Sequence, residues 1–198
     1  MSDWIYGLSI LGNLGEIFPE NSSLAILVII LILVLLGLSA FFSSAEIAMF
    51  SLSKHRIDAM VTEDVSNAKV VSRLREHPQN LLVTLLVGNN IVNIAMASVT
   101  TSVLALYYTG GVAIALSTFI ITILVLVFGE IIPKSYAIRN PESWSIKIAR
   151  MVDFFGSMFS PVVLVFIRLA QIITREDSEV AISSPYVTRD EIQDLLEV

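Results

Sequence analysis

The chain has 198 residues, of which 55% are hydrophobic and only 15% charged, and it carries a formal charge of −6. This composition excludes a disordered chain, and the absence of cysteine excludes a disulfide framework and a thiolate metal site. The negative charge gathers in residues 175–198, which hold two arginines and seven acidic residues, so no nucleic-acid partner is expected.

Three apolar stretches are long enough to cross a bilayer as helices, which takes about 20 apolar residues each. The sequence predicts these spans at residues 23–50, 79–106 and 112–137, within a transmembrane domain of residues 23–140. A lead of residues 1–22 precedes the first span, and a short turn with Tyr107 and Tyr108 joins the last two. Pro78 suits the first turn of the second span, where a missing N–H costs little.

A hydrophilic segment, residues 51–80, separates the first two spans and is expected to form two short helices. It contains five basic residues, whereas the lead and the tyrosine turn contain none. Basic residues favour the cytoplasmic side of a membrane. We therefore expect a multi-pass protein of the cell membrane whose loop 51–80 and C-terminus are cytoplasmic and whose N-terminus is extracellular.

Residues 141–175 allow two interpretations. Hydropathy alone would place a fourth span at residues 151–173, but Pro161 interrupts that stretch. Charged residues are also spread along the segment: Lys147, Arg150, Asp153 and Arg168. We expect instead a kinked pair of juxtamembrane helices that lies along the inner face of the membrane as a belt.

The last residues, 176–198, are expected to begin an acidic cytosolic helical region. Thr188 and Glu191 form a capping box, and a short apolar face follows them. We therefore expect this chain to be a truncated part of a longer protein.

Polar side chains interrupt all three spans at similar depths: Ser43 and Ser44, then Asn89, Asn90 and Asn93, then Glu130. Polar groups in hydrocarbon are costly and usually face a partner, a cavity or an ion. Asn89 and Asn93 are four residues apart and share one helix face, whereas Asn90 points elsewhere. Pro133 has no N–H, so the carbonyl of Gly129 is expected to lose its helical donor.

These groups are all hard oxygen ligands, which suit Mg²⁺, Ca²⁺ or an alkali cation rather than zinc or copper. The sequence therefore predicts a cation site in the inner half of the membrane. Its expected ligands are the side chains of Ser43, Asn89, Asn93 and Glu130 and the carbonyl of Gly129. Ser44, Asn90, Pro133 and Lys134 are expected to surround it.

Each of these residues also has a structural explanation. Serine and asparagine in membrane helices often form interhelical hydrogen bonds, and Ala40, Ser44 and Ala48 could form a packing or dimer face. Glu130 and Lys134 are four residues apart and could form an ion pair, while Glu46 is expected to be solvated or paired. The occurrence of so many polar groups at one depth favours a functional site.

Three runs of this sequence carry a resemblance to a known family: FFSSAEIA (41–48), LLVGNNIVN (85–93) and FGEIIPK (128–134). They resemble the membrane domain of the CorC/cyclin M (CNNM) magnesium transporters, over about residues 20–175. The resemblance implies an all-α membrane protein with three transmembrane helices, a cytoplasmic helix pair and a juxtamembrane belt, assembled as a homodimer in the lipid membrane.

The resemblance also implies a function and further partners. It implies Mg²⁺ transport, generally export, with Na⁺ as the counter-ion, and the same five ligands named above. Ser44 and Asn90 match the motifs but are weaker candidates for direct ligands. A CBS-pair domain that binds ATP with Mg²⁺, and that is missing from this chain, is expected in the longer protein.

Two functions therefore compete. A magnesium transporter should lose ion flux when Glu130 is replaced by Gln, whereas a membrane magnesium sensor or scaffold should bind the ion without flux. An enzyme is not expected, because the predicted spans contain no histidine, no His-Glu-x-x-His motif and no paired aspartates.

Overall fold

The computed structural model describes the backbone of residues 22–174 and the side chains of residues 26–169. The expected lead before residue 22 and the expected acidic region 176–198 lie outside the described residues. Every element in the described part is helical, as the sequence predicts. In chain order these elements are α2 (Ser22–Ser51), α3 (Lys54–Thr62), α4 (Ala68–Glu76), α5 (Pro78–Leu104), α6 (Gly110–Leu124), the π-helix η1 (Val125–Ile131), α7 (Ile132–Arg139) and α8 (Pro141–Thr174).

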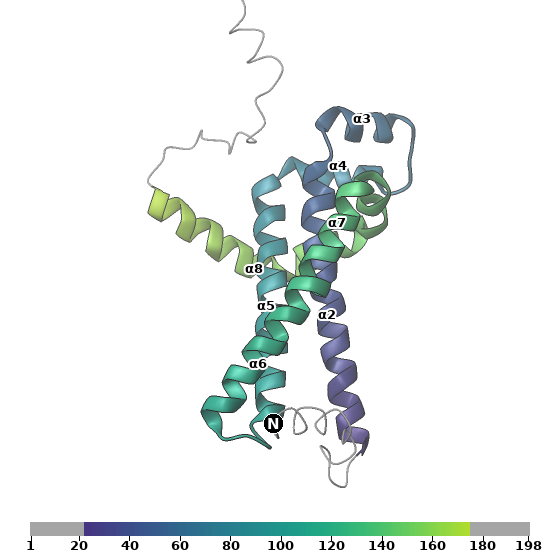
Figure 1. Cartoon of the computed structure of the whole chain (residues 1–198). Coiled ribbons are helices and arrows are strands. Elements are labelled where there is room, and N and C mark those ends of the chain that lie inside the picture. Colours follow the sequence, from purple (N-terminus) through teal and green to yellow (C-terminus); the bar gives the residue numbers. More distant parts are fainter. Residues whose placement is uncertain (1–21, 175–198) are drawn as a thin grey trace, which may run out of the picture.

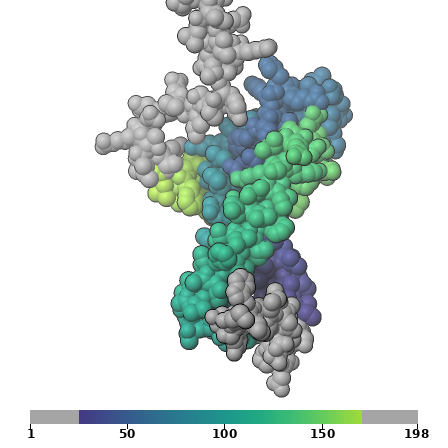
Figure 2. Space-filling view, in the orientation of Figure 1, coloured from purple at the N-terminus to yellow at the C-terminus, as the bar shows by residue number. Residues whose placement is uncertain are grey.

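The three predicted spans correspond to α2, α5 and the continuous column α6–η1–α7, with bounds that differ by one or two residues. In Figure 1, α2 and α5 lie alongside each other and run in opposite directions, and the column crosses in front of them. Figure 2 shows the column covering much of this face, with α2 partly visible behind it. Long apolar side chains on the outer surfaces of these helices are exposed, as expected of helices that face lipid.

The helices α3 and α4 and the start of α8 gather at one end of the molecule, which we call the loop end. The turn between α5 and α6 lies at the opposite end, which we call the turn end (Figure 1). Near the turn end, Thr101 Oγ1 and Ser117 Oγ lie 2.7 Å apart and join α5 to α6. This contact continues the polar face of α5 that begins at Asn89.

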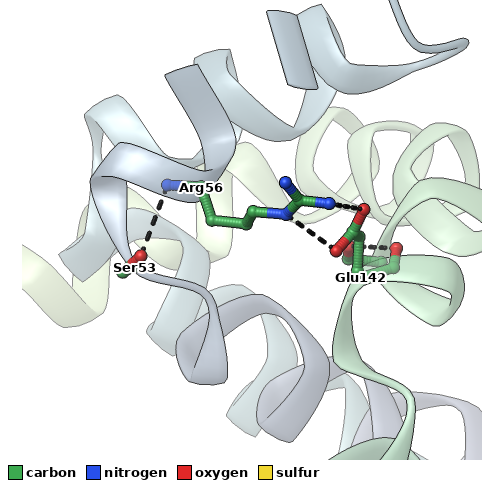
Figure 3. A network of polar contacts seen from close by, with 4 residues as sticks. Ser53, Arg56 and Glu142 are labelled. Atoms are coloured by element: carbon green, nitrogen blue, oxygen red, sulfur yellow. Dashed lines mark hydrogen bonds and ion pairs between the residues drawn. The ribbon is translucent and has the colours of Figure 1, made fainter. Parts of the chain in front are cut away.

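Ion pairs and hydrogen bonds fasten α8 to the helix pair at the loop end. Arg56 donates from Nε and from a terminal nitrogen to the two carboxylate oxygens of Glu142, at 2.9 and 2.7 Å (Figure 3). This bidentate contact raises the pKa of Arg56. Arg73 of α4 forms an ion pair with Asp153 of α8, with 2.7 Å between a guanidinium nitrogen and a carboxylate oxygen.

The turn between α3 and α4 contributes a further anchor through Asn67. Its backbone is left-handed, with φ of 63°, a conformation that asparagine tolerates better than most residues. The side chain of Asn67 donates to the carbonyl of Ile146 at 3.1 Å and accepts from Arg150 at 2.8 Å. The turn thus holds the first half of α8 against the helix pair.

The segment 141–174 differs from the expected pair of helices, because α8 is one continuous helix of 34 residues with Pro161 inside it. By length and composition alone, α8 is a fourth candidate span of the described chain. Figure 1 shows its last part projecting sideways, across the direction of α5. That direction agrees with a juxtamembrane position, and the three-span topology stays a prediction.

A group of aromatic rings connects α8 to the other helices. The ring of Phe42 on α2 is buried. Its centroid lies 4.9 Å from the ring centroid of Phe155 and 6.4 Å from that of Phe159, both on α8. On its other side, the ring fills the space over Gly88 of α5. This contact between Phe42 and Gly88 sets how closely α2 and α5 approach each other. Ser43 and Asn89 are the next residues in the two helices.

Candidate cation site

A buried serine joins the three long helices. Ser39 of α2 is fully buried, and its hydroxyl donates to Oδ1 of Asn93 at 2.8 Å and of Asn89 at 3.3 Å. A hydroxyl has one proton, so the two amide oxygens share it and keep unused lone pairs. We call these three side chains, Ser39, Asn89 and Asn93, the oxygen cluster.

The third helix reaches the oxygen cluster through Gly129 of η1. A Cβ added to Gly129 would lie only 2.8 Å from Ser39 Oγ, closer than real Cβ atoms approach. The glycine therefore allows the backbone of η1 to lie directly against the serine. This close approach places the backbone of η1 against the same hydroxyl that the two asparagines accept from.

Ser43 lies one helical turn from Ser39 on the same face of α2, toward the loop end. It is 1% exposed, and its Oγ has no hydrogen-bond partner among the described residues. A buried hydroxyl without a partner costs on the order of 1–3 kcal/mol. The Ser43 hydroxyl is therefore available to an ion or a water.

The π-helix η1 leaves a further carbonyl near Pro133 without a helical donor. The N–H of Ile132 donates to Val127, five residues earlier, rather than to Phe128. Pro133, five residues after Phe128, has no N–H. The carbonyl of Phe128 therefore lacks a helical donor, in addition to the carbonyl of Gly129, whose usual donor position is occupied by Pro133.

The carbonyls of Gly129 and Glu130 share a single nearby donor, the N–H of Lys134, which lies five and four residues further on. The transition from η1 to α7 thus leaves more carbonyl oxygens than amide hydrogens. π-Helical turns of this kind are frequent at functional sites. The backbone at this point can offer oxygen to a cation.

Glu130 is partly buried and has no hydrogen bond or ion pair with any other described residue. The ion pair with Lys134 that its spacing allowed is not formed. Lys134 instead lies 3.5 Å from the carboxylate of Glu46 on α2, so Glu46 is paired as expected. The Glu130 carboxylate is the acidic group nearest in sequence to the carbonyls of η1 that lack helical donors.

Two of the predicted surrounding residues point away from the oxygen cluster. Asn90 is exposed, and its amide donates to the carbonyl of Leu86 in its own helix. Ser44 is buried but donates to the carbonyl of Phe41, also in its own helix. Ser44 and Ala48 are buried inside the chain, so this stripe packs within the protein itself.

The structure thus joins Asn89 and Asn93 through Ser39, a residue that the sequence pattern did not single out, and places Gly129 against the same serine. The signal for Ser39 was its position four residues before Ser43, on the same helix face. Among the described residues, no side-chain hydrogen bond or ion pair connects Ser43 or Glu130 to the two asparagines. Within residues 26–169, His, Asp and Glu side chains form no group of three or more that could hold a metal ion.

Comparison with known proteins connects this arrangement to a group of membrane proteins. The cyclin M transmembrane N-terminal domain (CNNM) matches residues 30–198. A UPF0053 protein of Haemophilus influenzae is 38% identical over 145 residues, which are 73% of this chain and 34% of the relative. The UPF0053 inner membrane protein YfjD of Escherichia coli is 36% identical over 139 residues, or 70% of this chain and 31% of the relative.

A more distant relative carries a more specific name. The polyamine export protein of Haemophilus influenzae is 26% identical over 159 residues, which are 74% of this chain and 37% of the relative. The chain spans about a third of the length of these three relatives.

Proposed function

Because the chain belongs to the cyclin M (CNNM) transmembrane family, we propose that it transports Mg²⁺ across the membrane, in the direction of export and with Na⁺ as the counter-ion. The observation that carries the proposal is the oxygen cluster beside η1. There, two amide oxygens from α5 converge on one hydroxyl from α2 at 2.8 and 3.3 Å. Two amide oxygens that share one hydroxyl proton keep lone pairs free, and such oxygens can be offered to a cation.

The chemistry of the surrounding groups supports a small, hard and releasable ion. Mg²⁺ takes oxygen ligands and retains several of its waters, so it needs few direct ligands from a protein. In the proposed site these are Ser43, Asn89, Asn93, Glu130 and the carbonyl of Gly129, with Phe128 as an additional backbone candidate. Neutral oxygens with a single carboxylate hold the ion weakly enough to release it to the other side.

The proposal includes an assembly and an orientation. The transporter is a homodimer in the cell membrane, with the loop end in the cytoplasm and the turn end outside. The ion reaches the site from the loop end in one state and leaves toward the turn end in another. A CBS-pair domain outside this chain binds ATP with Mg²⁺ and regulates these states.

A polyamine is a second candidate cargo, because one relative is named a polyamine export protein. A polyamine carries several ammonium groups along its length and needs acceptors distributed in the same way. The cluster's two asparagines are four residues apart, which is about 6 Å along a helix. This compact arrangement favours a single small ion.

Ion binding is the first experiment, with the purified chain in detergent and Mg²⁺, Ca²⁺, Na⁺ or spermidine as the probe. A ligand at a hundredfold excess over its Kd stabilises a folded protein by about 2.7 kcal/mol. We expect Mg²⁺ to raise the unfolding temperature, and Asn93→Ala and Glu130→Gln to abolish this rise. The matched controls are Asn90→Ala and Ser44→Ala, whose side chains bond within their own helices.

The outcomes separate the candidate functions. Stabilisation by spermidine alone would replace Mg²⁺ with a polyamine as the cargo. If Mg²⁺ still stabilises Asn93→Ala and Glu130→Gln, the proposed location of the Mg²⁺ site is wrong. Where Mg²⁺ binds, liposomes loaded with a Mg²⁺-sensitive dye distinguish a transporter from a sensor, because a sensor binds the ion and gives no flux.

A further inference from the structure

The hydroxyl of Ser39 is the only group among the described residues that hydrogen-bonds both asparagine oxygens of the cluster. Two amide oxygens that approach the same hydroxyl repel each other, because both carry partial negative charge. A shared proton between them offsets this repulsion and fixes their separation. Without the hydroxyl, each asparagine side chain could rotate about its own χ angles.

Ser39 itself is held in place from three sides. It is fully buried on α2, the two asparagines of α5 accept its proton, and the backbone of Gly129 closes the remaining side. A side chain enclosed in this way has little freedom to adopt another rotamer. The position of the hydroxyl is therefore set by the packing of three helices.

We propose that Ser39 is a positioning residue that holds the oxygens of Asn89 and Asn93 at the spacing required by Mg²⁺ and thereby sets the preference for Mg²⁺ over Ca²⁺. The inference rests on the proposed function, because it concerns the same site. It assigns to Ser39 a role in ion selectivity through the asparagines, and it does not make Ser39 a ligand.

The physical reason lies in the different demands of the two ions. Mg²⁺ requires nearly ideal octahedral geometry with oxygens at about 2.0–2.1 Å. Ca²⁺ accepts six to eight oxygens at about 2.3–2.6 Å in flexible arrangements. Asparagine oxygens that are free to move therefore weaken Mg²⁺ binding much more than Ca²⁺ binding.

The test compares the Kd values of Mg²⁺ and Ca²⁺ by isothermal titration of the purified chain. Loss of one hydrogen bond that orders the site should raise the Kd of Mg²⁺ about fivefold to tenfold in Ser39→Ala. The Kd of Ca²⁺ should change much less, so the selectivity ratio falls. Ser39→Thr keeps the hydroxyl and should retain most of the preference.

Two further variants make the result specific. Ser44→Ala removes another buried serine hydroxyl of α2, one that bonds to its own helix, and should leave both Kd values unchanged. Gly129→Ala places a methyl group against Ser39 Oγ and should lower the selectivity ratio as Ser39→Ala does. If Ser39→Ala does not fold, Gly129→Ala and Ser39→Thr decide the question through the same ratio.

The outcomes distinguish this inference from the proposed function. A wild-type chain that binds neither ion overturns both. A chain that binds Mg²⁺ but keeps its selectivity ratio in Ser39→Ala and Gly129→Ala overturns the inference alone. Equal weakening of both ions in these variants also overturns it, because a purely structural serine would affect both alike.

Discussion

At the scale of single residues, two glycines determine how closely the helices approach the proposed site. Gly88 of α5 receives the ring of Phe42, and Gly129 of η1 receives the hydroxyl of Ser39. Both glycines lie next to a predicted ligand, Asn89 or Glu130. Their missing side chains create the contacts on which the neighbouring polar groups depend.

Replacing Gly88 with Ala should destabilise the protein. The added Cβ would lie 2.5 Å from the ring of Phe42, which is 1% exposed and packs against Phe155. Overpacking of this kind costs about 1–3 kcal/mol, which a chemical or thermal unfolding experiment in detergent can measure.

The matched control is Gly37→Ala, because an added Cβ at Gly37 meets no other atom within 4 Å. In a helix interior this change should be neutral or stabilising, by up to about 1 kcal/mol. Equal effects of the two substitutions would show that Phe42 does not restrict the space over Gly88.

At the scale of elements, η1 is the unusual part of the third long helix. Its seven residues include Gly129 and Glu130, and Pro133 follows in α7. A helix that changes from π to α register, with a proline in the next turn, leaves carbonyl oxygens without helical donors. Backbone of this kind is tolerated inside a membrane where it lines a cavity or is otherwise satisfied.

Pro133→Ala should stabilise the ion-free protein and weaken its response to Mg²⁺. The new N–H can bond to the carbonyl of Phe128 or Gly129, and removing proline from a helix interior gains up to about 3 kcal/mol. We expect a higher unfolding temperature without ion and a smaller rise on adding Mg²⁺.

Pro161→Ala is the control, because Pro161 is also inside a helix but lies in α8. It should give a comparable backbone gain with the Mg²⁺ response intact. An undiminished Mg²⁺ response in Pro133→Ala would mean that the opened backbone of η1 takes no part in binding.

At the scale of the whole molecule, the position of α8 decides the topology. Its first half is fastened to the helix pair by Glu142, Asp153 and the side chain of Asn67. Its aromatic residues Phe155 and Phe159 pack against Phe42. The remainder projects sideways from α5 (Figure 1), a direction that agrees with the predicted belt, while by length and composition α8 is also a candidate span.

Thiol labelling can test this topology directly, because the wild-type chain contains no cysteine. With a membrane-impermeant maleimide, Thr109→Cys should react from outside the cell and Glu63→Cys only from the cytoplasmic side. Leu169→Cys should also lack reactivity from outside, because α8 is expected to stay at the loop end. Labelling of Leu169→Cys from outside would instead show that α8 crosses the membrane as a fourth span.

The sequence by itself determined the helical class, the bounds of the three predicted spans to within two residues, and which helix face carries Asn89 and Asn93. These features follow from local periodicity and hydropathy, which each segment carries without its neighbours. The spacing of four residues also separated Asn89 and Asn93 from Asn90, and the structure agrees.

Only the tertiary structure decided which residues meet. Ser39 looked like one more small residue in an apolar run, and its role depends on α5 and η1 arriving at the same place. The partner of Lys134 was likewise decided by packing, because Glu46 on another helix competes with Glu130 four residues away. The register of η1 added Phe128 to the carbonyls without a helical donor, since the choice between α and π bonding depends on how the whole column packs. Contacts between distant segments follow from the summed packing of all the helices, which a local pattern does not contain.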